Sequence, residues 1–413
     1  MLVQVRVLFL VPFLYCMTFP GENDNASASI FLPSAFHGEK LVEEVQAARQ
    51  QLGRGGPVLA FVFVSVEWAP HLSEMLEILR REGGIDNVVG CSGGGLVGIG
   101  QEIEQAPGCT MLFLKLPATR LRRAEITSGD LEDVAKGAPL DMITGVTRED
   151  FSGWVTVANP MRLPTDLWLA AWNRDYAGLP LYGGLASSHG TEDPFLFTEE
   201  GRTDAAMLAV HFADGVRLGG VVSQGCRPIG EPYIVTRVNQ NMLVTIGQRS
   251  AYEVLEEAFD SLDLADQFGA KGNIFAGLAI SEYKDEFRRG DFLVRNILGG
   301  DPQAGVLAVG AFPRVGQTLQ FQLRDRNAAD EDLRLQCAAA QNRYGQPFAG
   351  LLFSCLGRGR SLFGDPHHDS AVVEDVFGRI PLSGFFCSGE IGPVGGQNFL
   401  HGYTAATVFF MHS

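Results

Sequence analysis

The clearest structural signal in the chain is an alternation of apolar runs and helical stripes between residues 58 and 116. Residues 58–64 form a continuous apolar run with β-branched members, which predicts a buried strand. Apolar residues then recur at the i, i+3, i+4, i+7 spacing of a helix that starts at Leu72 and ends at Gly83-Gly84. A short strand leads into a glycine loop at 90–100, and residues 109–116 are a further apolar strand.

The same order of segments recurs twice more. We interpret the three copies as helix, short strand, Gly/Ser-rich turn and strand, which predicts an internally repeated layered fold. Chance similarity among glycine-rich turns is the alternative in a chain with 50 glycines. The middle copy comprises a helix at 167–176, the turn segment 181–187 and a strand at 207–212, and the last comprises a strand at 348–355, a helix at 371–377, a strand at 382–387 with a glycine loop to Gly396, and a strand at 403–411.

Further β segments separate these copies. A hairpin is expected around Asn239-Gln240-Asn241, and Ser250-x-x-Glu253 is a capping box that opens a helix through Phe259. Hairpins together with crossover helices predict an α/β (α+β) fold with mixed, largely antiparallel sheets covered by helices in a layered sandwich. We expect a leader or disordered segment at 1–37 and two domains at 38–266 and 267–413, with the boundary at the polar turn 267–273.

The first twenty residues are ambiguous. The apolar stretch from Val5 to Met17 is too short to span a bilayer, and no A-x-A-like cleavage site follows it. It is either an export signal or a translated leader ahead of a true start at Met17. The cytoplasm is the expected location, with export through residues 1–20 as the minor alternative.

Composition and charge narrow the function classes. The net charge of −16 argues against nucleic acids and anionic membranes, which need basic surface. Seven scattered cysteines without a CxxC pair indicate reduced thiols in a cytosolic protein rather than a zinc site. No cofactor or metal is predicted, and no stable membrane association is expected.

Three catalytic or ligand motifs are matched only superficially. Gly93-x-Gly95-x-x-Gly98 lacks the following helix and the acidic residue of a dinucleotide site. Gly90-x-Ser92-x-Gly94 resembles a hydrolase nucleophile elbow, but that motif also needs a following helix. The adjacent histidines at 367–368 have no further evident metal ligand, so a solvated loop is the default.

Charged residues at the ends of apolar strands are more informative, because a buried charge must be paired. They either pair with each other or line a cavity that holds an anionic or zwitterionic ligand, for which arginine is well suited. For Cys355 a buried, inert thiol is the first interpretation, ligand contact the second and catalysis the third. The candidate ligand-binding residues are Arg295, Asn296, Arg324, Asp325, Cys355, Arg358, Cys387 and Glu390.

Several long motifs resemble FIST proteins (F-box and intracellular signal transduction). The C-terminal half carries Phe353-Ser354-Cys355-x-Gly357-Arg358-Gly359, then Gly384 to Pro393, then His401-Gly402-Tyr403-Thr404. The N-terminal half carries Gly90 to Gly95 and Gln224 to Gly230. The resemblance runs from about Gly38 to the C-terminus and is of the stand-alone bacterial type. It implies a sensory or adaptor module that binds small ligands such as amino acids, whereas eukaryotic relatives join ubiquitin ligases.

We therefore expect a small-ligand-binding sensory module that is not an enzyme, with an amino acid or small carboxylate as ligand and a separate signalling protein as partner. The alternative is an interaction scaffold without a small ligand. A hydrolase or thiol enzyme that uses Ser92, Cys355 or Cys387 is the third hypothesis.

Overall fold

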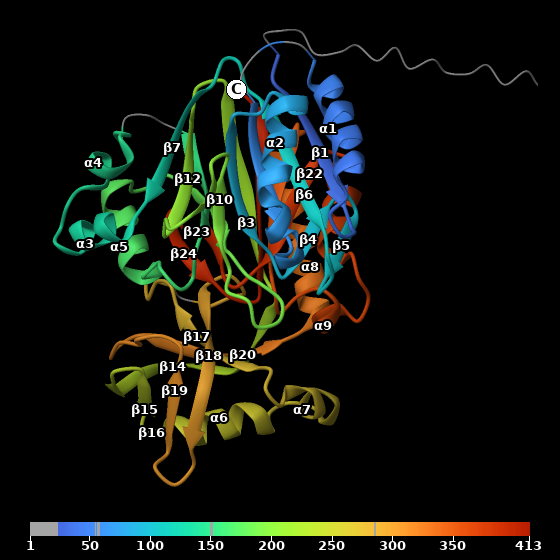
Figure 1. Cartoon of the computed structure of the whole chain (residues 1–413). Helices are drawn as coiled ribbons and strands as arrows, with labels where there is room; N and C mark the ends of the chain where they lie inside the picture. The colour runs from blue at the N-terminus through green and yellow to red at the C-terminus, as the bar shows by residue number, and fades with distance from the viewer. Residues whose placement is uncertain (1–23, 54, 56–57, 149–151, 285) are drawn as a thin grey trace, which may run out of the picture.

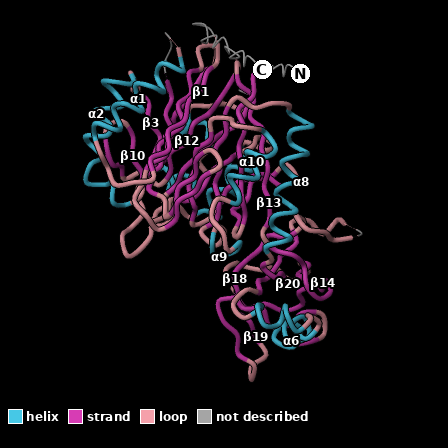
Figure 2. The backbone as a smooth tube through the Cα atoms, turned by 90° about the vertical axis from the view of Figure 1, so that its right-hand side faces the viewer, coloured by secondary structure: helices cyan, strands magenta, loops and turns pink. Residues whose placement is uncertain are grey.

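The computed structural model describes residues 24–53, 55, 58–148, 152–284 and 286–413. Four sheets make up two bodies. Three six-stranded sheets with their helices form a large body, and a seven-stranded sheet with two helices forms a small body at one end of it, as both views show (Figures 1 and 2).

The first sheet is built around β2 (Val58–Val64), which is buried along its whole length. It pairs in parallel with β3 (Asn87–Ser92) and antiparallel with β6 (Cys109–Lys115). Its outer face is covered by α1 (Gly38–Leu52) and α2 (Leu72–Gly83), which share one apolar cluster with the strands. A 3₁₀ helix at Val66–His71 joins β2 to α2.

One expectation is wrong within this sheet. Residues 26–32, which were predicted to belong to a disordered lead-in, form β1 (Ala26–Leu32) and pair antiparallel with β6. The segment Ala-Ser-Ala-Ser-Ile-Phe-Leu alternates buried and half-buried positions, but its small residues conceal the strand period in the sequence. The predicted leader at 1–20 lies outside the described residues.

The second and third sheets repeat the first. In each sheet, the last strand of the unit lies between the first strand and the second strand. The second strand also pairs in parallel with the third strand. The predicted internal repeat is therefore confirmed. The second unit comprises β7 (Arg120–Ile126), α3 (Ser128–Ala135), α4 (Leu140–Thr144), β8 (Ser152–Ala158), α5 (Thr165–Asp175), β9 (Leu181–Leu185) and β12 (Met207–Ala213), and the third comprises β13 (Val216–Gln224), α8 (Arg326–Tyr344), β21 (Ala349–Cys355), α9 (Arg360–Phe363), α10 (His368–Phe377), β22 (Leu382–Cys387) and β25 (Thr404–His412).

Each unit also contains a hairpin that pairs with the sheet of another unit. The expected glycine loop at 90–100 instead holds β4 (Gly95–Gly98), which pairs with β22 of the third sheet. The hairpin of the second unit pairs with β3, and that of the third unit pairs with β9. The remaining hairpin strands are β5 (Gln101–Glu104), β10 (Leu196–Thr198), β11 (Gly201–Thr203), β23 (Glu390–Val394) and β24 (Gln397–His401).

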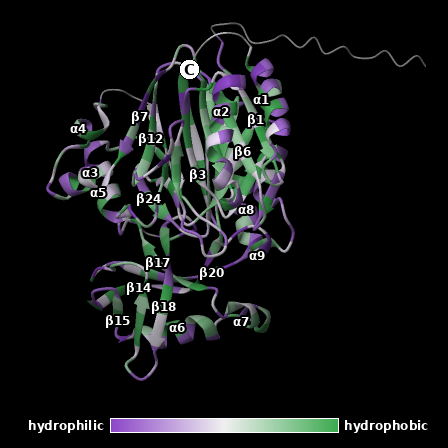
Figure 3. Ribbon diagram, in the orientation of Figure 1, coloured by the Kyte–Doolittle hydropathy of each residue, from purple (hydrophilic) through white to green (hydrophobic). Residues whose placement is uncertain are grey.

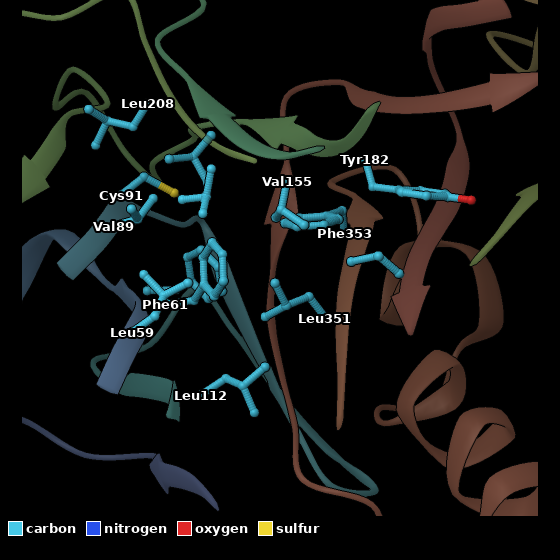
Figure 4. Close-up of a cluster of buried hydrophobic side chains, with 14 of the residues drawn as sticks. Leu59, Phe61, Val89, Cys91, Leu112, Val155, Tyr182, Leu208, Leu351 and Phe353 are labelled. Atoms are coloured by element: carbon cyan, nitrogen blue, oxygen red, sulfur yellow. The ribbon is translucent and has the colours of Figure 1, made fainter. Parts of the chain in front are cut away.

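The inner faces of the three sheets share a single core. Figure 4 shows Phe61 and Val89 of the first sheet, Val155 of the second and Phe353 of the third in this cluster, all of them buried. Hydrophobic residues accordingly concentrate on the strands, whereas hydrophilic residues colour much of α1 and the loops (Figure 3). This exclusion of apolar surface from water is the main stabilising contribution in such a layered fold.

The small body is inserted between β13 and α8. Its sheet closes on itself, because β14 pairs with both β20 and β15. The domain boundary expected at 266/267 falls inside its helix α7, and strands from both sides of that boundary share the sheet. The elements are β14 (Cys226–Asn239), β15 (Met242–Ile246), β16 (Arg249–Ser250), α6 (Ala251–Asp260), α7 (Leu264–Ala270), β17 (Ile274–Ala279), β18 (Phe292–Asp301), β19 (Val306–Val309) and β20 (Thr318–Arg324).

Candidate functional site

A pocket of about 480 Å³ opens where the small body meets the large one. The ends of β21 and β22, the β24–β25 turn and the start of α5 form its large-body side, and β18 forms its small-body side. It has both polar and charged members, as is usual for small-molecule sites. The lining residues are Asp166, Val294, Arg295, Asn296, Gly310, Cys355, Leu356, Gly357, Cys387, Ser388, Gly389, Leu400, His401, Gly402 and Tyr403.

Arg295 is the cation of this pocket. Its Nη1 donates to the carbonyl oxygens of Val294 (3.1 Å) and Leu400 (3.0 Å). Among the described residues it forms no ion pair. Burial lowers the pKa of the Arg295 guanidinium, and the negative charge of Asp166 opposes that shift. A half-buried guanidinium bonded only to carbonyls keeps donors available for an anion.

Tyr403 fixes the turn that faces Arg295 and Asn296. Its hydroxyl donates to Asn296 Oδ1 (3.1 Å), and its ring lies 4.2 Å from the Phe275 ring, centroid to centroid. The Tyr403 backbone has φ 59°, a left-handed conformation that costs a non-glycine residue energy and often occurs at functional sites. The two bodies are thus tied together at the pocket itself.

Burial favours the protonated forms of Cys355, at the floor of the pocket, and of its neighbour Glu390. Burial raises the pKa of the Cys355 thiol to about 12, and the neighbouring Glu390 carboxyl adds to the shift. Burial also raises the pKa of Glu390 well above its ordinary value. Glu390 Oε2 accepts from Thr404 N (3.3 Å), while its buried Oε1 has no hydrogen-bond partner. Near neutral pH the Cys355 thiol therefore keeps its proton, and burial shifts Glu390 toward its protonated form.

His401 also lines the pocket but stays neutral. It is buried, and its Nε2 lies 3.0 Å from the carbonyl oxygen of Gly392. Burial lowers its pKa to about 4. A neutral imidazole that is bonded to a backbone carbonyl supports the turn and contributes no charge to the pocket.

Three of the predicted residues lie elsewhere. Arg358 is fully buried and forms a bidentate ion pair with Asp369, at 2.7 and 2.8 Å, in a filled interior. Arg324 donates to Ser361 Oγ (2.8 Å) and Asn273 Oδ1 (3.3 Å) beside the pocket. Asp325 Oδ1 accepts from two backbone N–H groups at the start of α8, and its Oδ2 from Arg227 (2.8 Å).

Of the eight candidate residues, the structure therefore brings four into the pocket and places Glu390 against one of them. Sequence reasoning missed Asp166 and singled out Tyr403 only as part of a motif. No local pattern distinguishes Asp166, because an acidic residue in the first turn of a helix is common on electrostatic grounds alone. The four pocket residues are Arg295, Asn296, Cys355 and Cys387.

Ser92, the nucleophile of the hydrolase hypothesis, lies where the ends of β3, β9 and β22 meet. Its hydroxyl is buried, donates to the Ser187 carbonyl (2.9 Å) and accepts from Phe195 N (3.0 Å). No helix follows it. Across the described ranges, no group of three His, Cys, Asp or Glu residues is arranged to hold a metal ion.

Fold and pocket together define a repeated α/β protein with a ligand-sized pocket between two bodies. The FIST N domain matches residues 58–249 and the FIST C domain matches residues 237–393. The chain therefore belongs to the FIST family, whose domains are sensory and signal-transduction modules. The two matches meet well before the predicted boundary at 266/267.

Two bacterial relatives match most of this chain and nearly all of their own length. An uncharacterized protein of Mycobacterium tuberculosis is 35% identical over 89% of this chain and 95% of its own length. A second, from Mycobacterium bovis, is 33% identical over 90% and 95%. An F-box/LRR-repeat protein of Arabidopsis thaliana is 24% identical over 47% of this chain and 42% of its own.

Among solved structures, cyanuric acid hydrolase from A. caulinodans aligns over 94% of this chain and 99% of its own, with 10% identity and a TM-score of 0.35. That similarity is too low to indicate a function. No helix in the described part of the chain combines the length and the apolar character needed to cross a membrane.

Proposed function

We propose that this protein is a sensory module that binds a small carboxylate, and in particular an α-amino acid, in the pocket between its two bodies. The observation that carries the proposal is Arg295, a half-buried guanidinium that lines the pocket and forms no ion pair among the described residues. In this arrangement the carboxylate of the ligand pairs with Arg295, and Asp166 receives the ammonium group.

The remaining groups suit such a ligand. Charge-assisted hydrogen bonds from a guanidinium to a carboxylate are strong and directional. The Asn296 side chain and the protonated Cys355 offer neutral partners for a short side chain, and a volume of about 480 Å³ holds a molecule of amino-acid size. Because the ligand touches both bodies, its binding energy depends on their relative position.

We propose binding without chemical turnover. Burial raises the pKa of the Cys355 thiol to about 12, so the pocket presents no thiolate nucleophile near neutral pH, and the Asp166 carboxylate is assigned to the ammonium group of the ligand. The Ser92 hydroxyl already forms two hydrogen bonds with backbone groups, one to the Ser187 carbonyl and one from Phe195 N. A cytoplasmic location is proposed because all six described cysteines are unpaired and buried, which is typical of a reducing compartment.

A thermal-shift screen with the twenty amino acids and simple mono- and dicarboxylates tests the proposal. A ligand at a hundred times its Kd stabilises the folded state by about 2.7 kcal/mol, so a true ligand raises the Tm measurably. Arg295→Met should weaken that ligand roughly 10- to 150-fold, since a hydrogen bond to a charged group contributes about 1.5–3 kcal/mol. The matched control is Arg288→Met, a substitution of an exposed arginine in the same body, which should leave Kd unchanged.

Asp166→Asn separates the two ligand classes. It should weaken an amino acid but leave a plain carboxylate unaffected, because only the amino acid places an ammonium group beside Asp166. If no compound shifts the Tm of well-folded protein, and a stoichiometric protein partner instead survives exhaustive dialysis, the scaffold alternative replaces this proposal.

A further inference from the structure

Two cysteines end adjacent strands at the floor of the pocket. Cys355 is the last residue of β21 and Cys387 is the last residue of β22. The two strands run in parallel, and Cys355 and Cys387 are direct partners in their register. Both thiols are free, and both residues line the pocket.

The side chains of the two cysteines lie on the same face of the sheet. Two positions earlier, the register partners Phe353 and Phe385 contact each other with ring centroids 5.8 Å apart. Side chains alternate between the faces of a strand with a period of two, so Cys355 and Cys387 share the face of these rings.

The spacing suits a covalent link. Neighbouring strands lie roughly 4.8 Å apart, which falls within the Cα–Cα separations of about 4.4–6.8 Å that disulfides adopt. We propose that Cys355 and Cys387 form a dithiol site that a peroxide-class oxidant converts into a disulfide.

The reaction balances without a further co-reactant. The S–S bond forms as both thiols lose their protons, the two sulfur atoms together give up two electrons, the O–O bond of hydrogen peroxide breaks, and two water molecules leave. Burial raises the pKa of both thiols, so thiolate is scarce at neutral pH and the reaction accelerates as the pH rises. The link ties β21 to β22 and removes both S–H groups from the pocket floor.

The experiment uses the full chain and two probes. Phenylarsine oxide bridges neighbouring thiols without oxidation, and its oxygen leaves as water. Wild type should bind one equivalent at this site. Cys355→Ser and Cys387→Ser should each lose it, whereas the control Cys337→Ser, in α8, should retain it. Circular dichroism verifies that each variant is folded.

Hydrogen peroxide titration followed by non-reducing peptide mapping identifies the link in wild type alone, so the result does not depend on any variant. The expected product joins Cys355 to Cys387, and its rate should rise about tenfold per pH unit between pH 7 and 9. A link from Cys387 to Cys91, the other thiol that influences its pKa, would overturn the proposal, as would the absence of any link. Neither probe involves a carboxylate, so failure here is distinguishable from failure of the proposed function.

Discussion

Buried charged groups in this protein differ in how well they are compensated. Arg358 and Asp369 satisfy each other, and Ser354 Oγ adds a hydrogen bond to Asp369 (2.7 Å). The Glu102 carboxyl is only partly hydrogen-bonded. Its Oε1 accepts from Ser370 N (2.8 Å), but its buried Oε2 has no hydrogen-bond partner. Burial, together with the charge of Asp369, raises the pKa of Glu102 from 4.5 to about 8.

This raised pKa makes stability depend on pH. Between pH 4.5 and 8 the folded protein holds the Glu102 proton more tightly than the unfolded chain does, so the contribution to stability is complete below pH 4.5 and is lost as the pH rises through 8. Glutamine mimics the protonated acid. We expect Glu102→Gln to gain stability over wild type by up to about 1.4 kcal/mol per pH unit within this window.

Urea denaturation at pH 5, 6, 7 and 8 measures this difference. Glu44→Gln, on the exposed face of α1, is the control and should follow the wild-type curve in parallel. His401, whose pKa is lowered to about 4, has the opposite slope below pH 6.5, but it is present in both proteins and cancels. A Glu102→Gln curve parallel to wild type would show that the carboxyl stays ionised in the folded state.

At the scale of elements, several helices begin where short polar side chains cap them. The capping box predicted from Ser250 and Glu253 opens α6 as expected. Asp325 was expected to bind ligand, but its carboxylate caps α8 and accepts from Asn327 N and Ala328 N, both at 2.9 Å. A cap satisfies backbone donors that the first turn of a helix leaves free.

We expect Asp325→Ala to lower the free energy of unfolding by about 1–2 kcal/mol. Asp325→Asn should cost much less, because asparagine caps as well as aspartate, although it loses the charge that pairs with Arg227. Ligand affinity should not change with either variant. Chemical denaturation provides the measurement, and equal losses in the two variants would indicate that the ion pair rather than the cap matters.

At the scale of the whole molecule, the small body is an insertion with adjacent ends. Asp325 N donates to the carbonyl oxygen of Gly225 (3.1 Å), so the chain leaves and re-enters the large body at one point. The small body has its own apolar cluster, in which Ile229 and Leu319 are buried. The Tyr403 ring of the large body packs against Phe275 and Val294 of the small body.

Replacing residues 226–324 with a short glycine linker should therefore leave a folded large body. We expect a cooperative thermal transition at a lower Tm than that of the full chain, because the Tyr403 ring loses its partners. Carboxylate binding should disappear, because Arg295 and Asn296 are removed. Circular dichroism and the thermal-shift screen measure both outcomes, and a non-cooperative transition would show that the two bodies fold as one unit.

The amino-acid sequence by itself determined the local elements, the threefold repeat and the family. Each of these elements follows from a local pattern of apolar and polar residues within one segment. Examples are the apolar run at 58–64, the apolar stripe from Leu72 and the capping box at Ser250. The β1 strand at 26–32 was not predicted, because its small residues weaken the alternation of apolar and polar positions. Four of the fifteen pocket residues were predicted from the sequence, and two of these, Cys355 and Cys387, were found because they end apolar strands.

Only the tertiary structure decided which buried groups meet. Hydrophobic periodicity shows that a residue is buried but not what it is buried against. Arg358 and Arg295 look alike in the sequence, yet one faces Asp369 in a filled interior and the other faces an open pocket. Contacts between distant segments place each hairpin in the sheet of another unit. They also place Asp166 at the pocket, and no local sequence pattern encodes such contacts.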